Sequence, residues 1–174
     1  MDSNILYGQK EILEKVSSIA RYFNCLDYYN KLYKQDEEIV FVPILQGVVP
    51  FFSDIIKNIE FDPFIEYIGV SSYKGESQKE FNLYKSVDPE LVKGRKVWVF
   101  DDIADSGNTL GYVTGLLEQY GAKEVNTCVL LKKKHCIYPV NMFGFEMNDE
   151  WVWGYGMDAP NGKGRGLKDI YYKL

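Results

Sequence analysis

Three short runs, two of them fully apolar and one apolar in its second half, are separated by segments of helix length and place the strongest limit on what this chain can fold into. They read IVFVPIL at residues 39–45, VWVF at 97–100 and EVNTCVLL at 124–131. Runs that are apolar throughout are typical of strands buried on both faces. Helices are expected between them, within 46–59 and at 109–120. This alternation predicts an α/β fold, with a doubly wound, mostly parallel sheet and helices on both faces.

The segments outside these runs also have readable patterns. Residues 8–35 fit a long helix, because one face collects Ile12, Val16, Ile19, Ala20, Phe23 and Leu26. Residues 64–73 fit another strand, the polar residues 74–81 a loop, and residues 83–87 a short strand that pairs back. Gly121 is expected to cap the C-terminal end of the helix before it.

The C-terminal part of the chain changes character. Residues 133–174 are rich in aromatic residues and glycine and form short extended pieces, typical of a cap without a core of its own. We therefore expect one domain over residues 1–174, with a core at about 38–132 and a small hood from the C- and N-terminal parts, contributed mainly by 133–174.

Composition limits the function classes. A net charge of -5 argues against a surface built to neutralise nucleic-acid phosphates. Cys25, Cys128 and Cys136 are widely spaced and there is one histidine, His135, so neither a disulfide framework nor a zinc site is expected. Free thiols, no signal-peptide pattern at the N-terminus and no apolar run of about 20 residues together indicate a cytoplasmic protein.

The stretch VWVFDDIADSGNTL, residues 97–110, carries the clearest chemistry. Asp101 and Asp102 follow a strand directly, at the sheet edge where ligands of α/β folds bind. Residues 105–109 (DSGNT) then lead into a helix N-terminus, whose free N–H groups suit a phosphate. The acids suit Mg²⁺ or sugar hydroxyls. A ligand with phosphate, ribose and magnesium fits the whole stretch; an ordinary helix entry capped by Asp105 or Ser106 is the alternative.

This stretch resembles the phosphoribosyl diphosphate signature of type I phosphoribosyltransferases, and other segments are similar to the hypoxanthine–guanine branch of that family. The resemblance implies a purine salvage enzyme that transfers 5-phosphoribosyl from phosphoribosyl diphosphate (PRPP) to hypoxanthine, guanine or xanthine and releases diphosphate. It also implies Mg²⁺ as cofactor and a homodimer or homotetramer. Asp105 would be the general base at the purine, and Asp101, Asp102 and Asp158 the metal-binding acids.

Further phosphate-binding residues follow from the same resemblance. VPILQGVVPF matches the diphosphate loop, which implies a non-proline cis peptide bond at Leu45–Gln46. Gln46 stands where the family often has lysine. The whole implied PRPP set is Leu45, Gln46, Gly47, Ser72, Tyr73, Asp101, Asp102, Asp105, Ser106, Gly107, Asn108, Thr109 and Arg165. Ser72 and Tyr73 match a loop that closes over the site, and Lys163 is the alternative to Arg165.

The purine side is implied by VLLKKK and GFEMNDEWVWGYGMD. Lys132, judged the inward lysine, would donate to the exocyclic oxygen of a 6-oxopurine. Trp151 matches the stacking aromatic, Val152 a backbone contact to the base, and Asp158 an acid near metal and purine.

Two other functions remain open at this point. One is a non-catalytic nucleotide-sensing regulator of the same fold that binds RNA, although the acidic charge argues against it. The other is a receiver-like signalling domain, in which paired acids hold magnesium, although such acids usually follow the first strand. The matched segments also have ordinary structural interpretations: a solvated loop for VSSYKGES at 70–77, a basic turn after Leu131 and an aromatic hairpin near Trp151.

Overall fold

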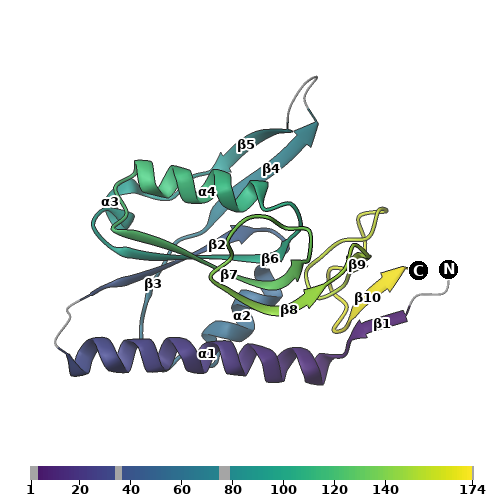
Figure 1. Cartoon of the computed structure of the whole chain (residues 1–174), viewed down its shortest axis with the longest axis horizontal. Helices are drawn as coiled ribbons and strands as arrows, with labels where there is room; N and C mark the ends of the chain where they lie inside the picture. The colour runs from purple at the N-terminus through teal and green to yellow at the C-terminus, as the bar shows by residue number, and fades with distance from the viewer. Residues whose placement is uncertain (1–3, 34–36, 75–78, 174) are drawn as a thin grey trace.

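A computed structural model of the chain describes residues 4–33, 37–74 and 79–173; the side chains of 72–74 and 79 lie outside the description. These described residues form fourteen helices and strands, arranged as two sheets with flanking helices (Figure 1). In chain order they are β1 (Asn4–Tyr7), α1 (Gln9–Leu32), β2 (Ile39–Leu45), α2 (Val49–Ile56), β3 (Phe64–Ile65), β4 (Ile68–Lys74), β5 (Lys79–Lys85), α3 (Pro89–Val92), β6 (Lys96–Ala104), α4 (Asn108–Gln119), β7 (Glu124–Lys133), β8 (Met142–Met147), β9 (Trp151–Trp153) and β10 (Ile170–Lys173).

The main sheet confirms the predicted fold class. Its strand order is β5-β4-β2-β6-β7-β8, with the short β3 beside β2. All neighbouring pairs are parallel except the antiparallel hairpin of β4 and β5. From β2 the chain continues to β4 on one side and later returns to β6 on the other side. The carboxyl ends of β2 and β6 therefore lie side by side at a topological switch point, where ligands of such sheets bind.

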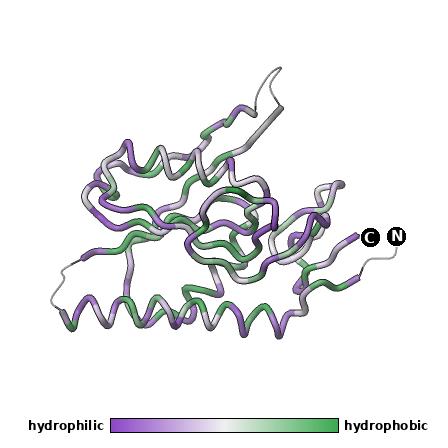
Figure 2. Tube along the Cα trace, in the orientation of Figure 1, coloured by the Kyte–Doolittle hydropathy of each residue, from purple (hydrophilic) through white to green (hydrophobic). Residues whose placement is uncertain are grey.

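Alternation along the central strands divides the core between the two faces of the sheet. In β2, Val40 and Val42 pack toward the face covered by α3 and α4, whereas Phe41 packs toward α1 and α2. The predicted face of α1 is confirmed, since Ile12, Val16, Ile19, Ala20 and Phe23 are buried and Leu26 is partly buried. Figure 2 shows apolar and polar residues alternating along this helix.

A second, three-stranded antiparallel sheet makes a hood at one end of the main sheet. Its order is β1-β10-β9, so strands from both ends of the chain pair there. The segment 133–174 divides between the two sheets, because β8 extends the main sheet parallel to β7. The hydroxyl of Tyr155, in the loop after β9, donates to Asp54 Oδ2 of α2 at 2.7 Å and ties the hood to the core.

Some boundaries differ from those predicted. The strand expected at 64–73 is two strands, β3 and β4, which both pair with β2. The predicted end of the loop at 74–81 was wrong, because β5 already begins at Lys79 and pairs with β4. Residues 75–78 lie outside the described part. No helix among the described residues is long and apolar enough to cross a membrane.

Candidate active site

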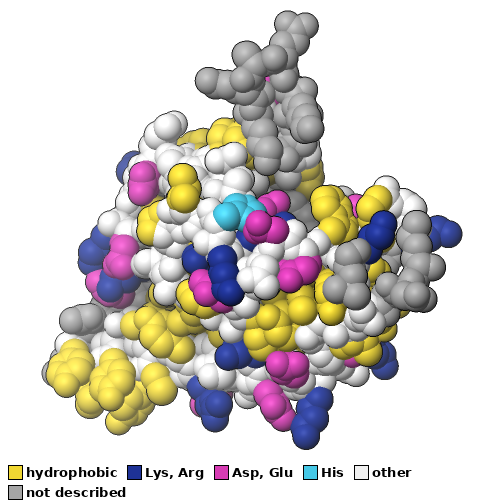
Figure 3. Space-filling model, turned by 45° about the vertical axis from the view of Figure 1, so that its right-hand side comes forward, with side chains coloured by type: hydrophobic (Ala, Val, Ile, Leu, Met, Phe, Trp, Pro, Cys, Tyr) yellow, Lys and Arg dark blue, Asp and Glu magenta, His cyan; other side chains and the backbone are white. Residues whose placement is uncertain are grey.

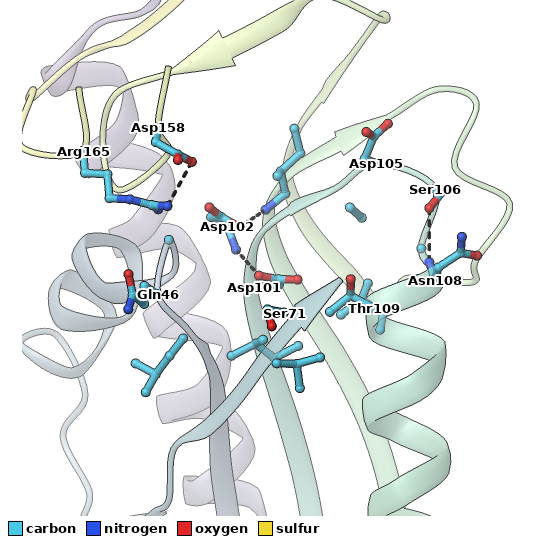
Figure 4. A pocket seen from close by; sticks show the side chains of 18 of the residues that line it. Gln46, Ser71, Asp101, Asp102, Asp105, Ser106, Asn108, Thr109, Asp158 and Arg165 are labelled. Carbon is cyan, nitrogen blue, oxygen red and sulfur yellow. Dashed lines mark hydrogen bonds and ion pairs between the residues drawn. The ribbon is translucent and has the colours of Figure 1, made fainter. Parts of the chain in front are cut away.

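A cavity of about 560 Å³ opens at the carboxyl ends of β2 and β6. Three groups of residues form its wall: the end of β2 and its turn, the β6–α4 connection, and two residues after the hood strand β9. The β4–β5 hairpin adds Val70, Ser71 and Tyr84, which sequence reasoning did not single out. Figure 4 shows Gln46 and Arg165 on the opposite side of the cavity from Ser106 and Thr109.

An acid pair lies at the floor of this cavity. Asp101 is buried, and its Oδ1 accepts a hydrogen bond from the backbone N–H of Asp102 at 3.0 Å. The Oδ1 of Asp102 accepts from the N–H of Ile103 at 2.9 Å. Burial raises the pKa of the Asp101 carboxyl well above its ordinary value, and the neighbouring Asp102 raises it further. Burial also raises the pKa of Asp102. A cation or hydroxyl donor in the cavity would stabilise both ionised groups.

The β6–α4 connection forms an anion cradle. Gly107, just before α4, has φ +82°, and a Cβ there would lie 2.2 Å from the Cβ of Tyr138. Only glycine fits this turn, which brings the first N–H groups of the helix toward the cavity. The N–H of Asn108 donates to Ser106 Oγ at 3.4 Å. The cradle has room and donors for a phosphate group.

The turn after β2 approaches the acid pair from the other side. Its Leu45–Gln46 peptide bond is cis, as the resemblance implies. A Cβ on Gly47 would lie 1.9 Å from Asp102 Oδ2, so the backbone there passes directly against that carboxylate. Residues 45–47 therefore present main-chain groups to the same cavity as Asp102.

The hood loop supplies the cation of this wall. Arg165 pairs with Asp158, Nη2 to Oδ1 at 2.9 Å, and its Nη1 donates to the carbonyl of Gly156 at 2.7 Å. Arg165 also counteracts the rise in the pKa of Asp102. Both Arg165 and Asp158 line the cavity, whereas Lys163, the alternative to Arg165, is not among the lining residues.

A smaller cavity of about 190 Å³ adjoins the first one and shares Asp102, Asp105 and Asp158 with it. Trp151 and Val152 of β9 line it from the hood. Trp151 is 57% exposed although it is the largest apolar side chain of the wall. An exposed indole over a cavity is suited to stacking on a flat heterocycle.

The lysine predicted for this cavity was wrong by one residue. Lys132 turns toward β8, where its Nζ lies 3.4 Å from Glu146 Oε1 and 5.4 Å from the ring centre of Phe143. Lys133 lines the cavity instead, is 8% exposed and places Nζ 3.3 Å from Asp105 Oδ1. Successive side chains of a strand point to opposite faces, and three consecutive lysines do not mark which one faces inward.

Most of the other predicted residues meet at the two cavities. The first contains Leu45, Gln46, Gly47, Asp101, Asp102, Asp105, Ser106, Gly107, Asn108, Thr109, Asp158 and Arg165. Ser72 and Tyr73 lie on β4, but their side chains are outside the described part. Sequence reasoning did not place His135 near the site, although the structure puts it in contact with Asp105. The only feature of the sequence that could have drawn attention to it is that it is the single histidine.

Comparisons with known proteins agree with this geometry. Residues 9–160 match the family described as phosphoribosyl transferase domain. The hypoxanthine-guanine phosphoribosyltransferase of Dictyostelium discoideum is 30% identical over 165 residues, covering 91% of this chain and 88% of that protein. The one of Aquifex aeolicus is 30% identical over 172 residues, covering 96% and 92%. A crystal structure of a Staphylococcus aureus hypoxanthine phosphoribosyltransferase superposes with a TM-score of 0.84 at 26% identity, covering 98% of this chain and 91% of that one.

Proposed function

The chain belongs to the phosphoribosyltransferase family, and on that premise we propose that it is a purine salvage enzyme. It transfers the 5-phosphoribosyl group of PRPP to a ring nitrogen of a 6-oxopurine and releases diphosphate. One observation carries the proposal. An anion cradle, a buried acid pair and an aromatic cavity with a lysine meet at Asp102, Asp105 and Asp158.

On the phosphate side, the N–H groups and hydroxyls of residues 105–109 bind the 5-phosphate, and the α4 dipole assists. The ribose hydroxyls donate hydrogen bonds to the carboxylates of Asp101 and Asp102. Arg165 and the backbone at 45–47 bind the departing diphosphate, for which a guanidinium is well shaped. Ser72 and Tyr73, on the β4–β5 hairpin, cover the diphosphate in this proposal.

Magnesium belongs to the same proposal. The residues present suit this ion, because two adjacent carboxyls line the cavity in which the polyanionic substrate is proposed to bind. Burial raises the pKa of both carboxyls, and a bound cation would stabilise their ionised forms. Mg²⁺ keeps several waters and needs few protein ligands, so Asp101 and Asp102 suffice to hold it. Asp158, which lines the same cavity, would add a further carboxylate near the ion. The bound ion would neutralise charge on the diphosphate.

On the purine side, Trp151 stacks on the base and the Val152 backbone contacts its edge. Lys133, in place of Lys132, donates to the 6-oxo group. A fixed ammonium selects 6-oxopurines over adenine, because adenine presents an amino donor at the same position.

Asp105 is the residue proposed to accept the proton that leaves the purine nitrogen. Its carboxyl is on the wall of both cavities, between the anion cradle and Trp151. The charge that develops on the ribose carbon and on the diphosphate is stabilised by Asp102 and Arg165. Catalysis then consists mainly of positioning and electrostatics.

A spectrophotometric assay tests the proposal. Untagged protein is supplied with PRPP, Mg²⁺ and, separately, hypoxanthine, guanine, xanthine or adenine. We expect turnover with at least one 6-oxopurine and none with adenine. Turnover with adenine alone, or with no purine, would contradict the proposal. A homodimer or homotetramer in the cytoplasm is part of the same proposal, and light scattering checks the assembly.

A further inference from the structure

The single histidine of the chain bridges the base side of the site. Its Nε2 lies 2.9 Å from Asp105 Oδ1, and its Nδ1 lies 2.5 Å from Asp149 Oδ1. Asp105 precedes the anion cradle, and Asp149 lies in the turn that leads into β9 and Trp151. His135 therefore connects the loop of the proposed base to the strand that carries the stacking indole.

The two contacts define a protonation state. A neutral imidazole has one N–H donor and one acceptor nitrogen, so it cannot donate to two ionised carboxylates at once. With both partners ionised, only the imidazolium satisfies both contacts. The hydrogen bond to Asp149, followed by the charges of Asp149 and Asp105, accordingly raises the pKa of His135.

The charged groups around His135 are few. Asp105 faces it from the β6–α4 loop and Asp149 from the β8–β9 turn. From the end of β7, two residues before His135, Lys133 reaches the same Oδ1 of Asp105 at 3.3 Å. Lys134 turns away, with Nζ 2.9 Å from Asn148 Oδ1. Figure 3 shows the histidine at the surface among acidic and basic side chains.

We propose that His135 is a positioning residue for the proposed base: as the imidazolium it holds Oδ1 of Asp105, orients its other oxygen to the purine and links it to the Asp149 turn. This inference rests on the proposed function. His135 does not line the cavity beside Trp151, so it acts through Asp105 rather than on the substrate. When His135 loses its proton as the pH rises through its pKa, the neutral ring keeps one N–H and can no longer donate to both carboxylates. With that hydrogen on Nδ1, Asp105 loses its contact with the ring and keeps only the ammonium of Lys133.

Because the chain has one histidine, its imidazole can be followed without assignment. Imidazole signals of untagged, ¹⁵N-labelled protein are titrated by NMR for wild type, Asp105→Asn and Asp149→Asn. We expect the wild-type midpoint to lie above the ordinary 6.5 and each variant to lower it. A midpoint that neither variant moves would overturn the inference, whether or not the protein is an active enzyme.

Kinetics give the second readout. We expect His135→Gln to lower kcat by about tenfold with little change in the KM for the purine, since a displaced base slows the chemical step. The wild-type kcat/KM should fall as the pH rises through the NMR midpoint, and this fall should be absent in His135→Gln. Lys134→Gln, the matched control, removes a neighbouring charge that does not touch Asp105 and should keep the wild-type profile.

The outcomes separate the two proposals. An inactive wild-type enzyme would refute the proposed function while leaving the NMR test intact. An active wild type whose fall in kcat/KM with rising pH persists unchanged in His135→Gln would refute the role of His135 alone. If Lys134→Gln gave the same pH profile as His135→Gln, the effect would come from the loss of positive charge near the site, and the positioning role of His135 would also be refuted.

Discussion

Gly47 and Asp102 approach so closely that a Cβ on residue 47 would lie 1.9 Å from Asp102 Oδ2. We expect Gly47→Ala to displace that carboxylate and to lower kcat/KM by about 10²-fold, because a shift of an ångström at a site is enough for such a loss. The measurement is steady-state kinetics with PRPP and the best purine.

Gly115→Ala is the matched control for this glycine. Residue 115 lies inside α4 with no heavy atom within 4 Å of an added Cβ. The substitution should leave kcat/KM unchanged and stabilise the fold by about 0.5–1 kcal/mol, because alanine favours the helix over glycine. Equal kinetic losses in both variants would contradict a specific fit between Gly47 and Asp102.

Lys133 and Lys132 form a natural pair for testing purine selection. Lys133→Met should raise the KM for 6-oxopurines and reduce their advantage over adenine by about tenfold or more, because the ammonium donor is lost. Lys132→Met removes a lysine that faces Glu146 and Phe143, and should leave selectivity unchanged. Competition assays with hypoxanthine and adenine measure the ratio; the reverse ranking of the two variants would rule out Lys133 as the selector.

Asp101→Asn should stabilise the fold at neutral pH while it impairs turnover. Burial raises the pKa of Asp101, so its contribution to stability is full below 3.8 and is lost as pH rises through the folded-state pKa. At pH 7, well above 3.8, the carboxyl is ionised freely in the unfolded chain but not in the buried site, so Asp101 destabilises the fold relative to acid pH. Asparagine carries no charge and still accepts from the Asp102 N–H.

Differential scanning fluorimetry in EDTA checks this expectation. The Tm of Asp101→Asn should exceed that of wild type at pH 7 and the difference should shrink toward pH 4. A variant that melts below wild type at pH 7 would show that Asp101 is stabilised, not strained, in the folded protein.

Asp105→Asn separates chemistry from binding. The amide keeps the size of the side chain but cannot take up a proton, so turnover should fall by about 10²–10⁴-fold. Calorimetric titration with PRPP and Mg²⁺ should still show binding, because residues 106–109 and Arg165 are intact. Near-normal turnover in this variant would exclude Asp105 as the base.

The fold could be predicted from the sequence where a strand is buried on both faces of the sheet. β2, β6 and β7 are apolar over consecutive residues, and all three lie inside the main sheet, with a strand on either side. β1 left no comparable pattern, because it is four residues long and half exposed. Its partner β10 lies at the other end of the chain, and such a pairing has no local signature.

The site was readable where its residues are contiguous. The segment 105–109 follows the acid pair closely in sequence, so its composition and its place before a helix predicted a phosphate site, with a capped helix entry as the alternative. The lysine was misjudged because register decides whether residue 132 or 133 faces the cavity. The contacts of His135 depend on two loops, and only the folded chain brings Asp105 and Asp149 to its two nitrogens.

The most direct measurement is a crystal structure of the protein with a purine nucleoside 5′-monophosphate of the proposed product class, such as inosine 5′-monophosphate. We predict the phosphate on the N–H groups of residues 106–109, the ribose against Asp101 and Asp102, and the 6-oxo group beside Lys133 under Trp151. A nucleotide bound elsewhere, or with its base away from Trp151, would contradict a phosphoribosyltransferase site in this cleft.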